Sequence, residues 1–172
     1  MDSRDLASAA AGKPGLYWLW LSALTIVLDQ LTKLGIVDRL ALHESVTVTD
    51  FFSIVHWHNP GAAFSFLASQ PGWPRILFTV FALVAATIIL RLLWRTRGRG
   101  WFCAALALIL GGALGNLIDR FAYGYVVDFL LFHWRGWFFP AFNAADSAIS
   151  VGAAMLILDS LRKPQAPIGN QS

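Results

Sequence analysis

Two aspartates lie in apolar stretches of the chain, where a carboxylate is costly. Asp128 lies within residues 126–129 (VVDF) and Asp146 within residues 142–147 (FNAADS). A carboxylate in hydrocarbon costs about 3 kcal/mol or more, so an acid in such a place indicates a functional site. Two carboxylates that meet can share one proton, which is how aspartic proteases keep one acid and one base side by side. The two residues therefore predict acid–base hydrolysis, provided that the fold brings them together.

The composition is typical of a membrane protein. Of the 172 residues, 57% are hydrophobic and 13% are charged, and the mean hydropathy is +0.59. Soluble domains are about half apolar and about a quarter charged. We expect a single membrane domain over residues 1–172 with a flexible tail at 164–172. Four stretches approach the ~20 apolar residues that cross a bilayer: residues 16–35, 73–94, 101–118 and 140–158.

Basic residues predict the orientation of these four stretches. The connection at residues 91–99 contains four arginines and no acid, the N-terminal arm carries Arg4 and Lys13, and the tail carries Arg162 and Lys163. By the positive-inside rule, all three segments face the cytoplasm. Because no small-residue cleavage site follows the first stretch, we interpret it as an anchor that is not cleaved. Four transmembrane helices with both termini in the cytoplasm follow.

Helical spacing gathers polar residues onto single faces of three predicted helices. Asp29 and Lys33 are four residues apart, the spacing of an ion pair on a helix, and structural packing between helices is our preferred interpretation of both. With the predicted orientation, the polar faces all meet at the outer end of the membrane. They comprise Asp29 and Lys33 in the first stretch, Asn116, Asp119 and Arg120 in the third, and Asn143 and Asp146 in the fourth.

The outer segment at residues 36–72 predicts a small β-rich region. Residues 46–49 alternate in polarity and residues 51–58 are rich in strand-forming types. Residues 62–67 are apolar enough to lie on the membrane surface, and the aromatic loop at 121–139 suits the membrane interface. The predicted fold class is an all-α integral membrane protein with four transmembrane helices and a small extracytoplasmic β-rich segment between the first two.

The sequence does not support a metal site, a catalytic cysteine or a serine nucleophile. His56 and His58 would lie on one side of a strand, but no third metal ligand has a recognisable spacing, so we interpret them as exposed strand residues. Cys103 stands alone in an apolar helix, and no Gly-x-Ser-x-Gly motif exists. We expect no metal, no cofactor and no nucleic-acid partner. The carboxylates remain as the catalytic candidates.

Five blocks follow one another along the chain: residues 29–33 (DQLTK), 59–65 (NPGAAFS), 112–120 (GALGNLIDR), 126–129 (VVDF) and 139–147 (FPAFNAADS). In this order and at this spacing they resemble the lipoprotein signal peptidases, the type II signal peptidases of bacteria. The resemblance extends from the first predicted helix to the fourth.

This resemblance implies an intramembrane aspartic endopeptidase of the bacterial inner membrane, with its site near the periplasmic face. It implies prolipoprotein substrates that carry a diacylglyceryl group on a cysteine, cleavage before that cysteine, and inhibition by the cyclic peptide globomycin. We expect a monomer in contact with membrane lipids. The resemblance assigns the catalytic dyad to Asp128 and Asp146 and structural roles to Asp29 and Lys33. It assigns supporting positions to Asn59, Gly61, Asn116, Arg120 and Asn143, with which we group Asp119.

Two alternatives from other functional classes stay open at this point. One is a proton-coupled transporter that uses Asp29, Asp119 and Asp146 as a relay, although the inner halves of the second, third and fourth predicted helices carry no acid. The other is a non-catalytic four-helix membrane scaffold, in which asparagine could replace the acids. Cleavage of a lipidated precursor peptide by the purified protein would separate the peptidase from both.

Overall fold

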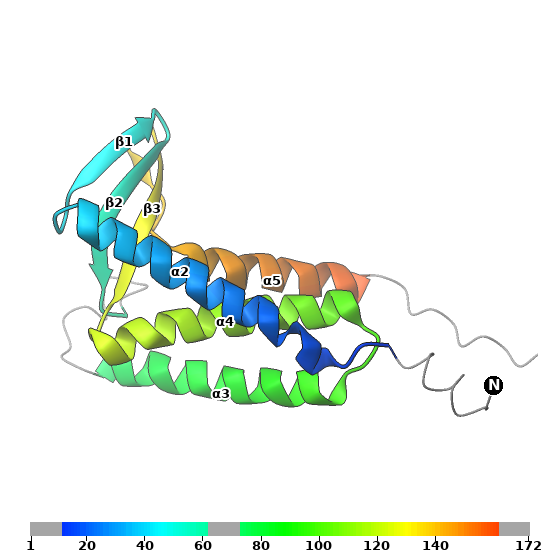
Figure 1. Ribbon diagram of the computed structural model, residues 1–172. Coiled ribbons are helices and arrows are strands. Elements are labelled where there is room, and N and C mark those ends of the chain that lie inside the picture. Colours follow the sequence, from blue (N-terminus) through cyan, green and yellow to red (C-terminus); the bar gives the residue numbers. More distant parts are fainter. Residues whose placement is uncertain (1–11, 62–72, 162–172) are drawn as a thin grey trace, which may run out of the picture.

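The computed structural model describes residues 12–61 and 73–161, which form a helical bundle with a small β-sheet at one end (Figure 1). The expectations for Arg4, for the surface segment 62–67 and for the tail from residue 162 onward lie outside the described residues. The elements are η1 (Gly15–Trp18), α2 (Leu19–Arg39), β1 (Ser45–Thr49), β2 (Phe52–Asn59), α3 (Trp73–Arg95), α4 (Gly100–Ala122), β3 (Val126–Trp134), β4 (Trp137–Phe138) and α5 (Ala144–Leu161).

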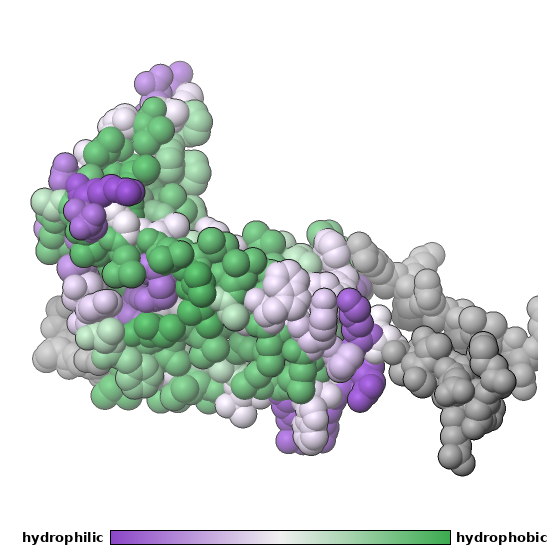
Figure 2. Space-filling view, viewed as in Figure 1, coloured by the Kyte–Doolittle hydropathy of each residue, from purple (hydrophilic) through white to green (hydrophobic). Residues whose placement is uncertain are grey.

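Four helical segments are long and apolar enough to cross a membrane, as the sequence predicts. Helix α4 is central: 61% of its most apolar window is buried, against 22% or less in the other three. Small residues let its neighbours approach closely, since a Cβ on Gly112 would lie 2.3 Å from the carbonyl oxygen of Ala145 in α5. The outer faces of the helices form a broad hydrophobic surface (Figure 2). The bundle is thus built around the helix that carries Asn116 and Asp119.

The sheet corrects the predicted fold class, because the protein is not purely α-helical. The predicted hairpin exists as β1 and β2, but β2 also pairs with β3, and the antiparallel order is β1-β2-β3-β4. Strands β3 and β4 come from the aromatic segment 121–139, which we predicted as an interfacial loop. An unpaired edge of β2 would leave its backbone groups without partners, and the strand-forming residues of β3 supply them.

The fourth helix begins later than the apolar pattern predicts. Phe142 pairs with Leu130 of β3 in an isolated bridge, and α5 starts at Ala144 rather than at residue 140. Asparagine is a favoured N-cap residue, and the Asn143 side chain accepts a hydrogen bond from the Asp146 N–H. Residues 140–143 therefore connect the sheet to the helix and bring β3 next to the first turn of α5.

Candidate active site

Asn143 links the two aspartates that the sequence singles out. Asp128 lies near the start of β3, Asp146 lies in the first turn of α5, and the fully buried Asn143 stands between them. Asn143 Nδ2 donates to Asp128 Oδ1 at 2.8 Å. Asn143 also exchanges two hydrogen bonds with Asp146, through the backbone N–H to Oδ2 at 3.2 Å and through Oδ1 from the Asp146 N–H at 3.0 Å. One capping residue thus positions both carboxylates, in the reciprocal pattern of a capping box.

Two further asparagines complete the set of donors. Asn59 Nδ2 donates to Asp128 Oδ2 at 3.0 Å, and Asn116 Nδ2 donates to Asp146 Oδ1 at 2.7 Å. Each of the four carboxylate oxygens therefore accepts one hydrogen bond from an asparagine. Hydrogen bonds to charged groups are stronger than those between neutral groups, so both side chains are held in fixed orientations.

The environment of Asp128 favours its protonated form. The residue is only 4% exposed. Burial raises the pKa of Asp128 to about 7, and the negative charge of Asp146 acts in the same direction. The hydrogen bonds from Asn59 and Asn143 and the charge of Lys33 oppose this shift and are outweighed. A carboxyl group of this kind holds a proton near neutral pH, as one member of an acid–base pair must.

A buried ion cluster lies directly behind the pair. Lys33 Nζ contacts Asp29 Oδ2 at 2.7 Å, Asp119 Oδ2 at 2.8 Å and Asn116 Oδ1 at 2.8 Å. Three acceptors use all three protons of an ammonium group. Because Lys33 and Asn143 Nδ2 both donate to Asn116 Oδ1, the amide of Asn116 must turn its NH₂ group toward Asp146. The lysine thereby fixes a donor to the candidate catalytic carboxylate.

Asp29 and Asp119 also hold the backbone next to each candidate catalytic residue. Asp29 Oδ1 accepts a hydrogen bond from the N–H of Ala145 at 2.9 Å, and Asp119 Oδ2 accepts one from the N–H of Val127 at 3.3 Å. A Cβ on Gly115 would lie 2.7 Å from Asp29 Oδ2, so this position requires glycine. Asp29, predicted as structural, and Asp119, predicted as a supporting residue of the site, therefore attach α5 and β3 to the same cluster.

Gln30 also belongs to this cluster, although it is not among the site residues predicted from the sequence. Its Nε2 atom donates to Asp119 Oδ1 at 2.8 Å and to the carbonyl oxygen of Gly115 at 3.2 Å. Its position between Asp29 and Lys33, within residues 29–33 (DQLTK), could have indicated that it belongs to the site.

A cavity of about 610 Å³, which Asp146 helps to line, opens between α3, α4 and α5. Its wall is apolar along the helices, with Phe78 and Phe81 on α3, and polar where it meets Asp146 and Asn116. Three more residues assigned to the site, Asn59, Gly61 and Arg120, also line it, whereas Asp119, Asp128 and Asn143 are not among its lining residues. An apolar chamber with a few convergent polar groups is the usual form of a binding site.

Gly61 and Arg120 play different parts at the rim of this cavity. Gly61 has φ 103°, a left-handed conformation that favours glycine, and its N–H donates to Asn59 Oδ1 at 2.9 Å. This bond turns the NH₂ group of Asn59 toward Asp128. Arg120 Nη1 donates to the carbonyl oxygen of Asn116 at 3.2 Å, while within residues 12–61 and 73–161 its buried Nε atom has no partner. A buried donor of this kind is ready to bind an incoming acceptor.

The prediction that His56 and His58 are both exposed is wrong for His56. His56 is buried, with Nδ1 at 2.9 Å from the carbonyl oxygen of Leu40 and Nε2 at 3.1 Å from His58 Nε2. A β-bulge between Ile54 and Trp57 turns His56 inward. Burial lowers the pKa of His58, and the nearby His56 adds a smaller shift in the same direction. Among the described residues no three potential ligands gather as a metal site would require.

The chain is similar in sequence and in fold to known proteins. A family model described as signal peptidase (SPase) II matches residues 21–162, a range that contains every residue of the candidate site. A lipoprotein signal peptidase of Paraburkholderia phytofirmans is 55% identical over 146 residues, with 85% of each chain covered. Another, from Ralstonia nicotianae, is 52% identical over 162 residues, with 94% of each chain covered. A solved bacterial membrane enzyme is similar in fold, with a TM-score of 0.77 and 27% identity over 86% of this chain and 94% of its own.

Proposed function

This chain belongs to the signal peptidase II family, and we propose that Asp128 and Asp146 are the catalytic pair with which it removes signal peptides from prolipoproteins. The protein is a membrane-embedded aspartic endopeptidase. The observation that carries the catalytic assignment is the set of hydrogen bonds by which Asn143 holds both carboxylates. A transporter and a non-catalytic scaffold are both set aside, because neither is a peptidase.

The proposed reaction uses one proton shared by the two aspartates. The ionised carboxylate takes a proton from a water molecule, whose oxygen attacks the scissile carbonyl carbon. The protonated carboxyl group donates to the carbonyl oxygen and then protonates the leaving nitrogen as the C–N bond breaks. The pair titrates as a unit, so the two roles belong to the pair. Asn59, Asn116 and Asn143 keep the carboxylates in place throughout, and Arg120 Nε offers a donor to a substrate carbonyl.

The raised pKa of Asp128 predicts how activity depends on pH. Burial and the charge of Asp146 bring this pKa to about 7. A carboxyl group is protonated below its pKa and ionised above it, so the pair loses its shared proton as the pH rises through this value. We expect kcat for a lipidated precursor peptide to fall above about pH 7 for this reason. A kcat that stays constant across this pH would contradict the shared-proton mechanism, and a circular dichroism spectrum at each pH controls for unfolding.

We propose that the lipid on the substrate cysteine is required for cleavage. The apolar wall of the 610 Å³ cavity runs from Asp146 along α3 and α4, and each buried methylene contributes about 0.8 kcal/mol. A precursor peptide that carries a diacylglyceryl group should be cut much faster than the same peptide without it. Both are assayed with purified protein in one detergent, and globomycin, which we expect to bind the same cavity, serves as the inhibitor control. Comparable rates for the two peptides would refute the lipid requirement.

We propose that the protein lies in the bacterial inner membrane with the sheet and the aspartates on the periplasmic side. Arg91, Arg95, Arg97 and Arg99 at the α3–α4 connection lie at the opposite end of the bundle, which supports a cytoplasmic position for that end. We also propose that the protein acts as a monomer, because Asn59, Asn116 and Asn143 of the same chain supply a hydrogen bond to every oxygen of the two carboxylates.

The orientation predicts the behaviour of reporter fusions. A reporter that works only in the cytoplasm should be active when fused after Lys163 and inactive when inserted at Asp50, in the β1–β2 turn. A reporter that works only in the periplasm should give the reverse pattern. If the first reporter were active at Asp50, Asp128 would face the cytoplasm, and the proposed orientation would be wrong.

A further inference from the structure

The two faces of the sheet differ in polarity. Residues paired across strands point to the same side, as do residues two apart on one strand. The register therefore places three sets on one face: Val46, Ile54 and Leu130; Phe52 and Phe132; Trp134 and Trp137. The opposite face is mixed: it carries Ser45, Thr47, Ser53 and His133 together with Val55, Leu131 and Phe138. We call the first set, together with Phe139, the apolar face.

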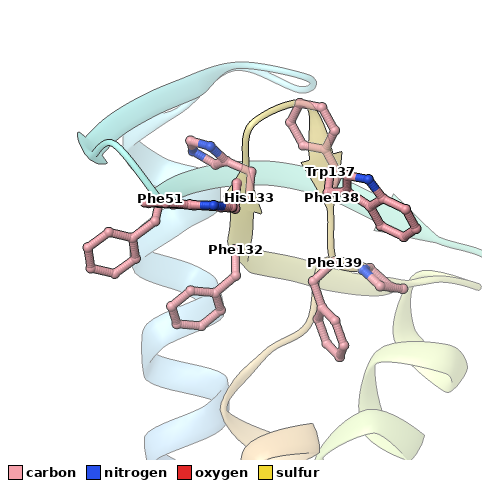
Figure 3. Close-up of a pocket in the computed structure, with 8 residues that line it drawn as sticks. Phe51, Phe132, His133, Trp137, Phe138 and Phe139 are labelled. Atoms are coloured by element: carbon pink, nitrogen blue, oxygen red, sulfur yellow. The ribbon is translucent and has the colours of Figure 1, made fainter.

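The apolar face points toward the side on which the helices lie. Near the bundle, Ile54 and Leu130 share a groove of about 510 Å³ with residues of α2 such as Leu28 and Leu31. Farther out, the rings of Phe132 and Phe139 point from the sheet toward the level of the helices (Figure 3). The alternation of side chains along the strands thus produces one continuous hydrophobic surface. This surface faces the side on which the transmembrane helices lie.

The outer part of this face has no protein cover among the described residues. At one end of the bundle the sheet extends sideways, away from the helices (Figure 1). Exposure reaches 58% for Trp134, 84% for Trp137 and 62% for Phe139. These side chains border a second apolar hollow of about 520 Å³, which continues around the sheet edge to His133 and Phe138 of the opposite face. Large exposed apolar patches mark contact with a partner or a membrane.

We propose that the apolar face rests on the phospholipids of the bilayer beside the bundle. The helices fix where the membrane lies, because they are long and apolar enough to cross it. Tryptophan is the residue most typical of the boundary between headgroups and hydrocarbon. Cations flank the face at both ends: Arg39 lines the groove beside α2, and the Arg135 guanidinium lies 5.8 Å from the Trp134 ring. Arginine beside an apolar surface matches a lipid phosphate above its acyl chains.

This contact would position the catalytic strand. Strand β3 carries Asp128 near one end and Trp134 at the other. The inner end is fixed by the hydrogen bond from the Val127 N–H to Asp119. Lipid under Trp134 and Trp137 would fix the outer end, so that β3 stays at one height relative to the membrane surface. The proposal requires that the protein spans a membrane, but it does not depend on which residues are catalytic. Its failure would therefore leave the catalytic assignment unchanged.

Neighbouring residues on opposite faces provide the test. In a Cys103→Ala background, which removes the only cysteine, single cysteines replace Trp137 on the apolar face or Phe138 on the other. A second matched pair is Val46→Cys and Thr47→Cys. Each protein receives a nitroxide label in phosphatidylcholine–phosphatidylglycerol nanodiscs, and its collisions with oxygen, which enters lipid, and with a water-soluble nickel chelate are measured by electron paramagnetic resonance.

We expect the oxygen-to-nickel collision ratio to be several-fold higher at position 137 than at 138, and higher at 46 than at 47. Equal access of the nickel chelate to both members of each pair would overturn the proposal, because the sheet would then stand clear of the bilayer. A high ratio at position 137 that appears only after a lipidated precursor is added would also overturn it, since the occupant would then be the substrate. Cleavage activity of the labelled proteins shows that they are folded.

Discussion

We expect Asp128→Asn and Asp146→Asn each to reduce kcat by about a thousandfold or more, while the protein stays folded and still binds substrate. Asparagine keeps the volume of aspartate, but it can neither take a proton from water nor donate one to the leaving nitrogen as a carboxyl group does. General acid–base groups contribute about 10²–10⁴-fold each, and here the loss of either residue removes the shared proton on which both roles depend. Single-turnover cleavage of a lipidated precursor peptide measures the effect.

The double variant separates a catalytic pair from two independent groups. Residues that act as a unit are not additive, so Asp128→Asn with Asp146→Asn should be scarcely slower than either single change. Asp159→Asn is the matched control, because this carboxylate pairs with Arg99 at the other end of the bundle, and its activity should equal that of the wild type. If Asp146→Asn kept about a tenth of the turnover, the barrier would have risen by only ~1.4 kcal/mol, too little for a catalytic acid or base.

We expect Lys33→Met to lower the free energy of unfolding by about 3–5 kcal/mol, the usual cost of breaking a buried ion pair by removing one partner. The substitution leaves the carboxylates of Asp29 and Asp119 buried without a cation. Activity also falls, because Asn116 loses the contact that turns its NH₂ group toward Asp146. The midpoint of thermal unfolding in detergent reports the loss of stability.

Neutralising the two acids provides the control for this variant. Lys33→Met combined with Asp29→Asn and Asp119→Asn should recover most of the lost stability, since no unpaired charge remains. An unfolding midpoint for Lys33→Met equal to that of the wild type would show that the cluster is hydrated rather than buried. Recovery of stability without recovery of kcat is the expected result for the triple variant, because the orientation of Asn116 still depends on the missing lysine.

The sequence determined much of this protein because the membrane restricts what a chain can do. Apolar length alone predicted the four helical segments that the structure contains. A carboxylate is costly among apolar residues, so Asp128 and Asp146 stood out without any knowledge of the fold. Helical spacing also paired Asp29 with Lys33, and the structure places these two side chains 2.7 Å apart.

Only the tertiary structure decided the rest, because it depends on pairing between distant segments. Strand β3 exists because β2 offers a free edge, and local composition could not distinguish that strand from an aromatic loop. The same pairing brings Asp128 to the N-terminus of α5, where Asn143 reaches both carboxylates. Asn116, the third partner of Lys33, lies 83 positions away along the chain. No periodicity in the sequence records a contact of this kind, since its geometry is set by how closely α4 packs against α2 and α5.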